Sequence, residues 1–143
     1  MQTRTSITRI VLTDDDVDDQ FFFQMALRQS GEKAELHVFD NGILLLEALI
    51  KGDTALPDVI FMDYNMPCKN AVQCMEELRQ HQHLQHIPVI ILTTGMSPAE
   101  MEKVYQKGAT ACIRKPHDLS SLVQLIKDVL ANKLTAREPI FCL

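Results

Sequence analysis

The sequence has no apolar run long enough to cross a bilayer, and its first residues lack the apolar core of a signal peptide. Residues 1–6 read Met-Gln-Thr-Arg-Thr-Ser, which is a polar start. Both absences argue against a membrane-spanning protein and against secretion. We therefore expect a cytoplasmic protein that does not bind a membrane.

The sequence also lacks a cysteine pattern typical of disulfides or zinc sites, and it has no excess of positive charge. The four cysteines, Cys68, Cys74, Cys112 and Cys142, show no CxxC spacing, so free thiols are expected rather than disulfides or a zinc site. The formal net charge is −5. Because phosphate backbones recruit basic surfaces, nucleic acid is not expected as the main partner.

Internal repeats, low-complexity segments and linkers are absent as well. The 143 residues, 46% of them hydrophobic, suit one domain with a single core. We predict one domain over residues 1–132 and a tail over 133–143, with no output domain. The apolar end of the tail, Ile140–Leu143, leaves three alternatives: packing on the domain, contact with a second copy in a homodimer, or fraying.

The chain does contain a regular alternation of short apolar runs and helix-period segments. Strands are predicted near 7–13, 35–39, 58–63, 88–93 and 111–114, and helices near 17–30, 42–51, 70–81, 97–107 and 118–132. Five strand–helix repeats predict an α/β fold, a doubly wound parallel sheet with helices on both faces. The candidate helix caps agree with these ranges: Asn70, Ser97 and Asp118 at helix starts, and Gly31, Gly52 and Gly108 at helix ends.

Polar side chains stand where the apolar runs end. Asp14 and Asp15 follow the first run, Asp63 ends the third, Thr93 ends the fourth, and Lys115 follows the fifth. Since the carboxyl ends of parallel strands share one edge of the sheet, these groups should lie together. Three carboxylates, a hydroxyl and an ammonium are a set suited to holding Mg²⁺ and a phosphoryl group.

The chemistry of that set can be assigned residue by residue. Asp15 and Asp63 can bind Mg²⁺ directly, Asp14 through water, and Asn65 through its backbone carbonyl. Asp63 can also attack phosphorus and form an aspartyl phosphate. Two further groups can then contact the phosphoryl oxygens. Thr93 would donate a hydrogen bond only once the phosphate is present, and Lys115 would balance charge, with a cis bond to Pro116 as one way to aim it inward.

The order of these motifs resembles the receiver domain of two-component response regulators over residues 7–132. The resemblance rests on an acid pair, an aspartate before x-Asn-x-Pro, a threonine after an apolar run, and Lys-Pro before the last helix. It implies a flavodoxin-like fold with strand order 2-1-3-4-5, an order that one family member exemplifies. It also implies Asp63 as phosphoacceptor, Asp14 and Asp15 as the acidic metal-site pair, Thr93 as the switch hydroxyl and Lys115 as the phosphate-binding lysine.

The implied function is that of a stand-alone, single-domain regulator. A histidine kinase or a histidine phosphotransfer protein would phosphorylate Asp63, and the face formed by the fourth helix, the fifth strand and the last helix would bind a target protein. Enzymatic activity would be limited to self-phosphorylation and self-dephosphorylation, with Asn65 and Gly95 flanking the path of the attacking water.

The sequence departs from the family pattern at two positions. Cys112 stands three residues before Lys115, where the family usually has Tyr or Phe, and Tyr105 on the preceding helix is a substitute for that aromatic. Ala71 replaces a glycine eight residues after the phosphoacceptor, so the turn there must form without a positive φ at that residue. The first departure favours an alternative function, a phosphorylation-independent interaction module.

Other readings of the same residues are weaker. Asp14-x-Asp16 opens like a haloacid dehalogenase-type phosphatase motif, but the later acid pair is missing, and the EF-hand pattern fails at Asp19 and Met25. We interpret Asp16, Asp18 and Asp19 as ordinary acids at a helix start. The histidines at 81, 83 and 86 are interpreted as a solvated helix end rather than a metal site.

Overall fold

The structure, a computed structural model, describes residues 8–52 and 55–131. The predicted strand residue 7, helix residue 132 and the 133–143 tail lie outside the described residues. Five strands form one parallel sheet: β1 (Thr8–Thr13), β2 (Ala34–Phe39), β3 (Val59–Asp63), β4 (Val89–Thr93) and β5 (Ala111–Arg114). Their order, β2-β1-β3-β4-β5, confirms the predicted doubly wound, flavodoxin-like α/β fold.

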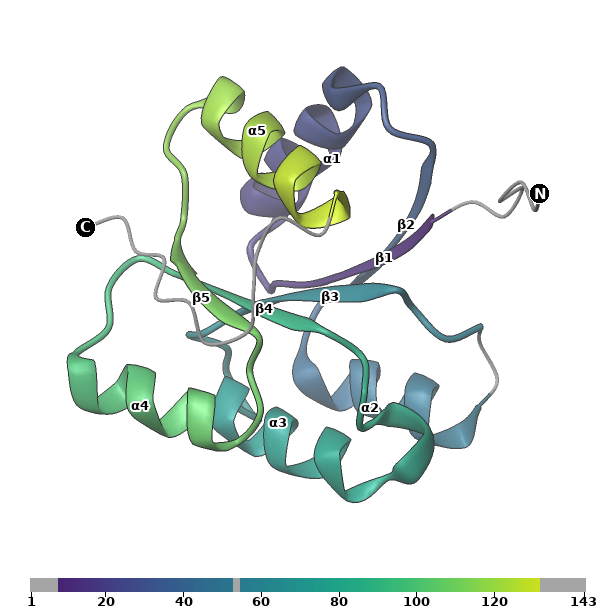
Figure 1. The fold of residues 1–143 in the computed structure, drawn as a ribbon, viewed down its shortest axis with the longest axis vertical. Helices are drawn as coiled ribbons and strands as arrows, with labels where there is room; N and C mark the ends of the chain where they lie inside the picture. Colours follow the sequence, from purple (N-terminus) through teal and green to yellow (C-terminus); the bar gives the residue numbers. More distant parts are fainter. Residues whose placement is uncertain (1–7, 53–54, 132–143) are drawn as a thin grey trace.

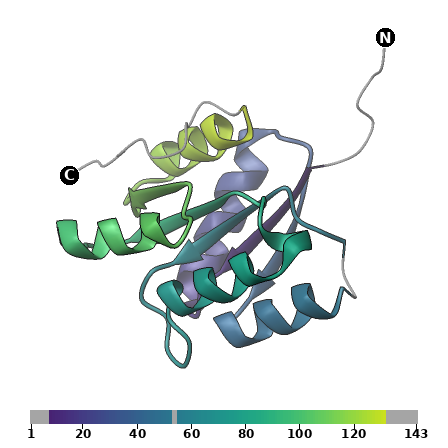
Figure 2. The ribbon, with the colours of Figure 1, turned by 60° about the horizontal axis from the view of Figure 1, so that its bottom comes forward.

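Helices cover both faces of this sheet (Figure 1). Helices α1 (Val17–Ser30) and α5 (Leu119–Leu130) lie on one face, and α2 (Gly42–Lys51), α3 (Ala71–Gln80) and α4 (Pro98–Gln106) lie on the other. Figure 2 shows the same two helical layers from another direction. A short 3-10 helix, η1 (Gln82–Leu84), was not predicted. Within the described chain, no helix is long and apolar enough to cross a bilayer.

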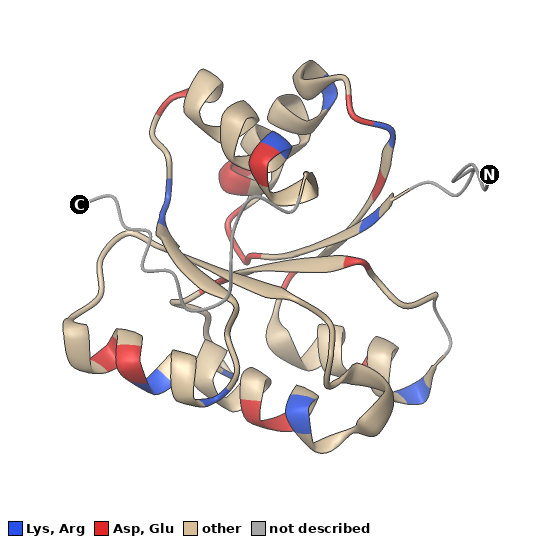
Figure 3. Ribbon diagram, viewed as in Figure 1, with Lys and Arg blue, Asp and Glu red and all other residues tan. Residues whose placement is uncertain are grey.

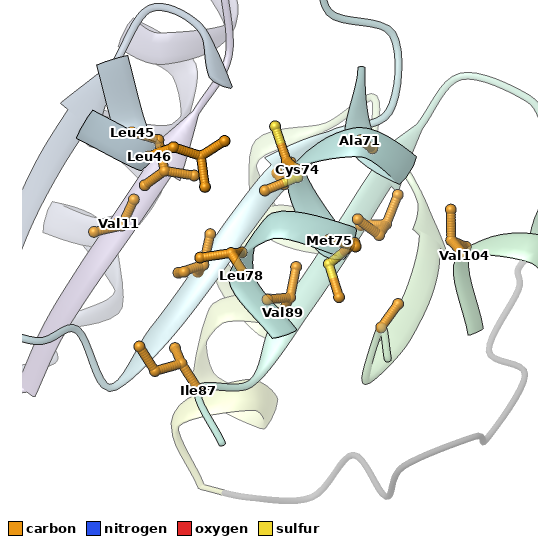
Figure 4. Packing of buried hydrophobic residues seen from close by; sticks show 14 of the residues in the cluster. Val11, Leu45, Leu46, Ala71, Cys74, Met75, Leu78, Ile87, Val89 and Val104 are labelled. Carbon is orange, nitrogen blue, oxygen red and sulfur yellow. The ribbon is translucent and has the colours of Figure 1, made fainter. Parts of the chain in front are cut away.

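Each layer has its own apolar core. All five residues of β3 and all five of β4 are buried, as the uninterrupted apolar runs predicted. Figure 4 shows how Cys74, Met75 and Leu78 of α3 pack toward Val89 of β4 and toward Leu45 and Leu46 of α2. On the opposite face Phe23 meets Phe61 edge to face, with ring centroids 5.0 Å apart. Burial on both sides fixes the sheet and therefore the edge on which the polar residues stand.

The helix starts and stops follow the predicted local signals. Asn70, Ser97 and Asp118 are N-caps whose side chains accept backbone N–H bonds, and Ser97 and Glu100 form a capping box. Gly31 and Gly52 end their helices in the left-handed conformation. These caps explain why the predicted bounds of α1 and α2 match the observed ones and why those of the other three helices differ by at most two residues at either end.

The loop between β3 and α3 forms its turn without a positive φ at Ala71. Ala71 is fully buried and begins α3, while the positive φ, 69°, falls on Cys68 instead. A cysteine in this region is uncommon, because its Cβ crowds the backbone there. The turn is closed by the N–H of Lys69, which donates to the carbonyl of Pro67 at 2.7 Å. The loop that follows the candidate phosphoacceptor is therefore built without the family's glycine.

Candidate functional site

Three acids meet at the carboxyl edge of the sheet, as predicted. Asp14 follows directly after β1, and its N–H donates to the carbonyl of Phe39 at 3.1 Å, which continues the β1–β2 pairing. Asp63 is the last residue of β3, the strand next to β1. One carboxylate oxygen each from Asp14, Asp15 and Asp63 lies within 4.8 Å of the others. Figure 3 shows acidic backbone where β1 passes into α1, and a basic stretch between β5 and α5.

Two of the three carboxylates are removed from solvent. Asp14 is 2% exposed and Asp63 is 6% exposed, whereas Asp15 is exposed. Each buried carboxylate accepts one backbone hydrogen bond, from the N–H of Asp16 at 2.9 Å and of Asn65 at 3.2 Å respectively. Burial nevertheless dominates, raising the pKa of Asp14 to about 6 and raising the pKa of Asp63 as well. A nearby positive charge would therefore stabilise the ionised form of both carboxyl groups.

Lys115 supplies part of that charge. Its Nζ lies 3.4 Å from Asp63 Oδ1, 3.3 Å from Asp14 Oδ2 and 2.8 Å from Asp19 Oδ2. Burial alone would lower the pKa of Lys115, but the hydrogen bond to Asp19 and the charges of Asp63 and Asp14 outweigh it and raise that pKa. The Lys115–Pro116 bond is trans, so the inward aim of the ammonium does not depend on a cis peptide.

Thr93 ends β4 beside this cluster and is 6% exposed. Its hydroxyl does not contact the carboxylates through any hydrogen bond of the described structure. It donates to the carbonyl of Gly95 at 3.0 Å and accepts from the N–H of Gly95 at 3.0 Å. The hydroxyl is therefore engaged with the loop between β4 and α4.

The donor set fits a hard divalent cation. Three carboxylates converge here, and a fourth, Asp19, lies against Lys115, so a single ammonium faces an excess of negative charge. Oxygen ligands of this kind are the ones Mg²⁺ prefers, with waters and a backbone carbonyl completing the shell. Asn65 lies in the adjoining turn, and its N–H already contacts Asp63. Across residues 8–52 and 55–131, these acids form the sole cluster of three or more potential metal ligands.

His81 is the C-cap of α3 and is half-buried, whereas His86 in the segment that follows is exposed. His83 is exposed and its Nε2 lies 3.2 Å from the carbonyl of Leu49. The rings of His81 and His83 meet edge to face with centroids 6.0 Å apart. No ligand geometry follows from this arrangement.

The region around Cys112 contains two tyrosines, Tyr105 and Tyr64. Cys112 is buried in β5, and its N–H donates to the hydroxyl of Tyr105 at 3.1 Å. Tyr64, directly after Asp63, packs against the same core, and its hydroxyl is hydrogen-bonded to Glu100 in the first turn of α4. Burial and the charge of Glu100 raise the pKa of Tyr64. Two tyrosines therefore tie α4 to the ends of β3 and β5.

Sequence reasoning missed two residues that shape the site. Asp19 does lie in the first turn of α1, as interpreted, but it also makes the shortest contact of Lys115, which the sequence did not indicate. Gln20 donates from Nε2 to the carbonyl of Asp14 at 2.7 Å and to Asp40 Oδ1 at 2.9 Å, which holds the acidic loop in place. Asp16 is more than a first-turn acid, since its side chain is the N-cap of α1. The Asp19–Lys115 contact spans 96 positions of the chain, and no local pattern signals it.

Comparison with known proteins agrees with this geometry. The family model described as "Response regulator receiver domain" matches residues 10–127. The polar-differentiation response regulator DivK of Brucella ovis is 32% identical over 87 residues, which cover 61% of this chain and 71% of DivK. The transcriptional regulator NtrC of Escherichia coli is 27% identical over 128 residues, 90% of this chain but 26% of NtrC. This chain thus spans about a quarter of that relative.

A solved structure gives the same result for the fold. The response regulator Rcp1 of Synechocystis is 24% identical over 124 residues, which cover 84% of each chain. The crystal structure of its Mn(2+)-bound form superposes with a TM-score of 0.77, covering 89% of this chain and 94% of Rcp1. With the family match, the strand order and the acidic cluster, the chain belongs to the response regulator receiver domain family.

Proposed function

We propose that this chain is a phosphoacceptor of a histidine-to-aspartate phosphorelay. A histidine kinase or a histidine phosphotransfer protein would donate the phosphoryl group, and Asp63 would accept it. The observation that carries the proposal is the placement of Asp63, buried at the sheet edge within reach of two other acids and 3.4 Å from the Lys115 ammonium. We propose that the protein acts in the cytoplasm.

A divalent cation, which we propose to be Mg²⁺, would be held by Asp14, Asp15, Asp63 and the backbone carbonyl of Asn65. When bound, it would neutralise charge on the transferring phosphoryl oxygens. The Mn(2+)-bound form of Rcp1 supports a divalent cation in this fold. The residues themselves contribute the rest: Asp63 provides the nucleophilic oxygen, and Lys115 provides an ammonium for a phosphoryl oxygen.

The switch would start at Thr93. Once the phosphoryl group is present, the Thr93 hydroxyl would exchange Gly95 for a phosphoryl oxygen, and the loop leading to α4 would follow. The face formed by α4, β5 and α5 would then present a changed surface to a target protein. An open groove between β5 and α5, lined by Ile113, Pro116 and Leu125 among others, supports this choice of face.

A second candidate function is a receiver-like interaction module that works without phosphorylation. The buried Cys112 favours it, because this position lacks an aromatic ring that could change rotamer when the Thr93 hydroxyl moves. The contacts of Tyr105 and Tyr64 with α4 and β5 offer a different route, and the complete set of acids, hydroxyl and ammonium favours the phosphoacceptor. We also propose that the domain ends at residue 132 and that two copies of the chain can form a homodimer.

One experiment separates the two functions. The full chain is incubated with acetyl phosphate, with and without Mg²⁺, and its intact mass is followed. The phosphoacceptor gains about 80 Da, the mass of one added HPO₃ group, and hydroxylamine removes it. Asp63→Asn keeps the shape of the side chain and should gain nothing. An unmodified native chain, or an equally modified Asp63→Asn chain, would favour the interaction module.

A further inference from the structure

The Lys115 ammonium is shared among three carboxylates before any phosphoryl group arrives. An ammonium has three N–H donors, and three acids surround it. Its shortest contact is not with Asp63, the proposed phosphoacceptor, at 3.4 Å, but with Asp19 on the first turn of α1, at 2.8 Å. The side chain of Lys115 is 18% exposed, so solvent offers it few alternatives. The resting position of the ammonium is therefore set largely by Asp19.

We propose that Asp19 is a positioning residue that competes with Asp63 for the Lys115 ammonium and so slows phosphorylation. This inference rests on the proposed function of Asp63. Asp19 lies outside the group of acids that could share a metal ion, namely Asp14, Asp15 and Asp63. Asp14, Asp15 and Asp63 would hold a divalent cation, which would offset their negative charge, whereas the charge of Asp19 would still attract Lys115. The competition for the ammonium is thus strongest in the metal-loaded protein.

The Asp19 contact is suited to be released. The side chain of Asp19 is 42% exposed, whereas that of Asp14 is 3% exposed. A partly solvated ion pair is weak, because water screens it and competes for both partners. A phosphoryl group on Asp63 brings additional negative charge within reach of Lys115 and can therefore draw the ammonium from Asp19. Breaking the Asp19–Lys115 ion pair requires little free energy, but it is required each time Asp63 is phosphorylated.

Asp19 takes no part in bond changes. In the reaction with acetyl phosphate, an oxygen of Asp63 forms a bond to phosphorus while the bond from phosphorus to the acetate oxygen breaks. Acetate leaves with that electron pair, and Asp19 neither gives nor accepts a proton. Removing the charge of Asp19 should therefore change the availability of Lys115 alone. From the usual strength of an exposed ion pair we expect about a threefold faster phosphorylation.

The test compares variants of the full chain in acetyl phosphate and saturating Mg²⁺, with the phosphorylated fraction followed over time by intact mass. Asp19→Asn removes the charge and keeps the shape, and Asp19→Glu keeps the charge. Asp18→Asn is the matched control, since it removes one charge from the same helical turn while the acids that contact Lys115 are Asp14, Asp19 and Asp63. Thermal unfolding of each variant verifies that it is folded.

The expected result is a roughly threefold faster reaction for Asp19→Asn and a wild-type rate for Asp19→Glu and Asp18→Asn. In a Lys115→Ala background, Asp19→Asn should give no increase. The inference is overturned if Asp19→Asn is no faster than wild type, if Asp18→Asn accelerates equally, or if the increase survives without Lys115. Failure of the wild-type chain itself to gain the adduct would instead overturn the proposed function.

Discussion

Asp14 is almost completely buried, although its carboxylate has few hydrogen-bond partners. The residue is 2% exposed, and its carboxylate has one backbone N–H and the Lys115 ammonium as partners. Burial raises its pKa to about 6 from an ordinary value of 3.8. The metal-free protein therefore spends free energy on keeping this carboxylate ionised at neutral pH, which a bound divalent cation would recover.

The sign of the resulting pH dependence follows from linkage. Because the pKa of Asp14 is higher in the folded protein, the folded state binds the proton more tightly than the unfolded chain does. Through this group, the free energy of unfolding falls as the pH rises from about 4 to about 6. Asp14→Asn removes the effect, so in EDTA the variant should be more stable than wild type above pH 6, by on the order of 2 kcal/mol.

Urea unfolding of both proteins between pH 4 and pH 7.5 measures this difference. The gap between Asp14→Asn and wild type should be small at pH 4 and grow through pH 6. Asp18→Asn, on an exposed position of α1, serves as the control and should show no such growth. A constant gap between Asp14→Asn and wild type across the range would contradict the account of Asp14.

Arg79 connects several elements on the face of the sheet that α2, α3 and α4 cover. From α3 its guanidinium donates to the carbonyls of Leu84, Gln85 and Ile87, and to that of Gly108 before β5, at 2.8 to 3.1 Å. Arg79 thus satisfies carbonyls of η1, of the segment entering β4 and of the turn after α4. The close approach also explains Gly108, where an added Cβ would lie 2.7 Å from Arg79 Nε.

Arg79→Met should therefore destabilise the protein, although Arg79 makes none of the contacts of the acidic cluster given above. The methionine keeps the apolar stem but leaves carbonyls without a donor, for which we expect a loss of roughly 2–3 kcal/mol in the free energy of unfolding. Arg28→Met, on an exposed position of α1, is the matched control and should change it by less than about 0.5 kcal/mol. Equal losses in chemical denaturation would show that the Arg79 contacts contribute nothing.

The elements that could be predicted from sequence are those whose signals are local. The apolar runs of β3 and β4, the cap at Ser97 and the polar residues at strand ends are all readable within a few positions, so the order of elements and the edge holding Asp14, Asp63 and Thr93 were predicted. The Asp19–Lys115 contact and the Arg79 hydrogen bonds join residues from different elements. They depend on how helices pack, which periodicity does not encode. The positive φ of Cys68 has no signal in its residue type.

At the scale of the whole molecule, binding of a cation at one edge should stabilise the entire fold. A ligand that binds only the folded state adds RT ln(1 + [L]/Kd), or about 1.4 kcal/mol when Mg²⁺ is present at ten times its Kd. We expect the thermal midpoint to rise by roughly 5 °C. The rise should be smaller at pH 5 than at pH 7.5, because Asp14 is largely protonated below its raised pKa of about 6.

Calorimetry of wild type, Asp63→Asn and Glu32→Gln in Mg²⁺ and in EDTA measures this effect. Asp63→Asn removes one carboxylate of the cluster and should lose most of the rise, while Glu32→Gln, exposed in the connection between α1 and β2, should keep it. The account of the metal site fails if Mg²⁺ leaves the wild-type midpoint unchanged or stabilises Asp63→Asn to the same extent.

The central claim is that Asp63, and not another acid of the cluster, carries the phosphoryl group. The most direct test is to phosphorylate the chain with acetyl phosphate and Mg²⁺, reduce the acyl phosphate with borohydride, and locate the reduced residue by peptide mass spectrometry. We predict that the reduced residue is Asp63 and that Asp63→Asn yields none. Reduction at Asp14, Asp15 or Asp19 of the native chain, or at no residue, would contradict the claim.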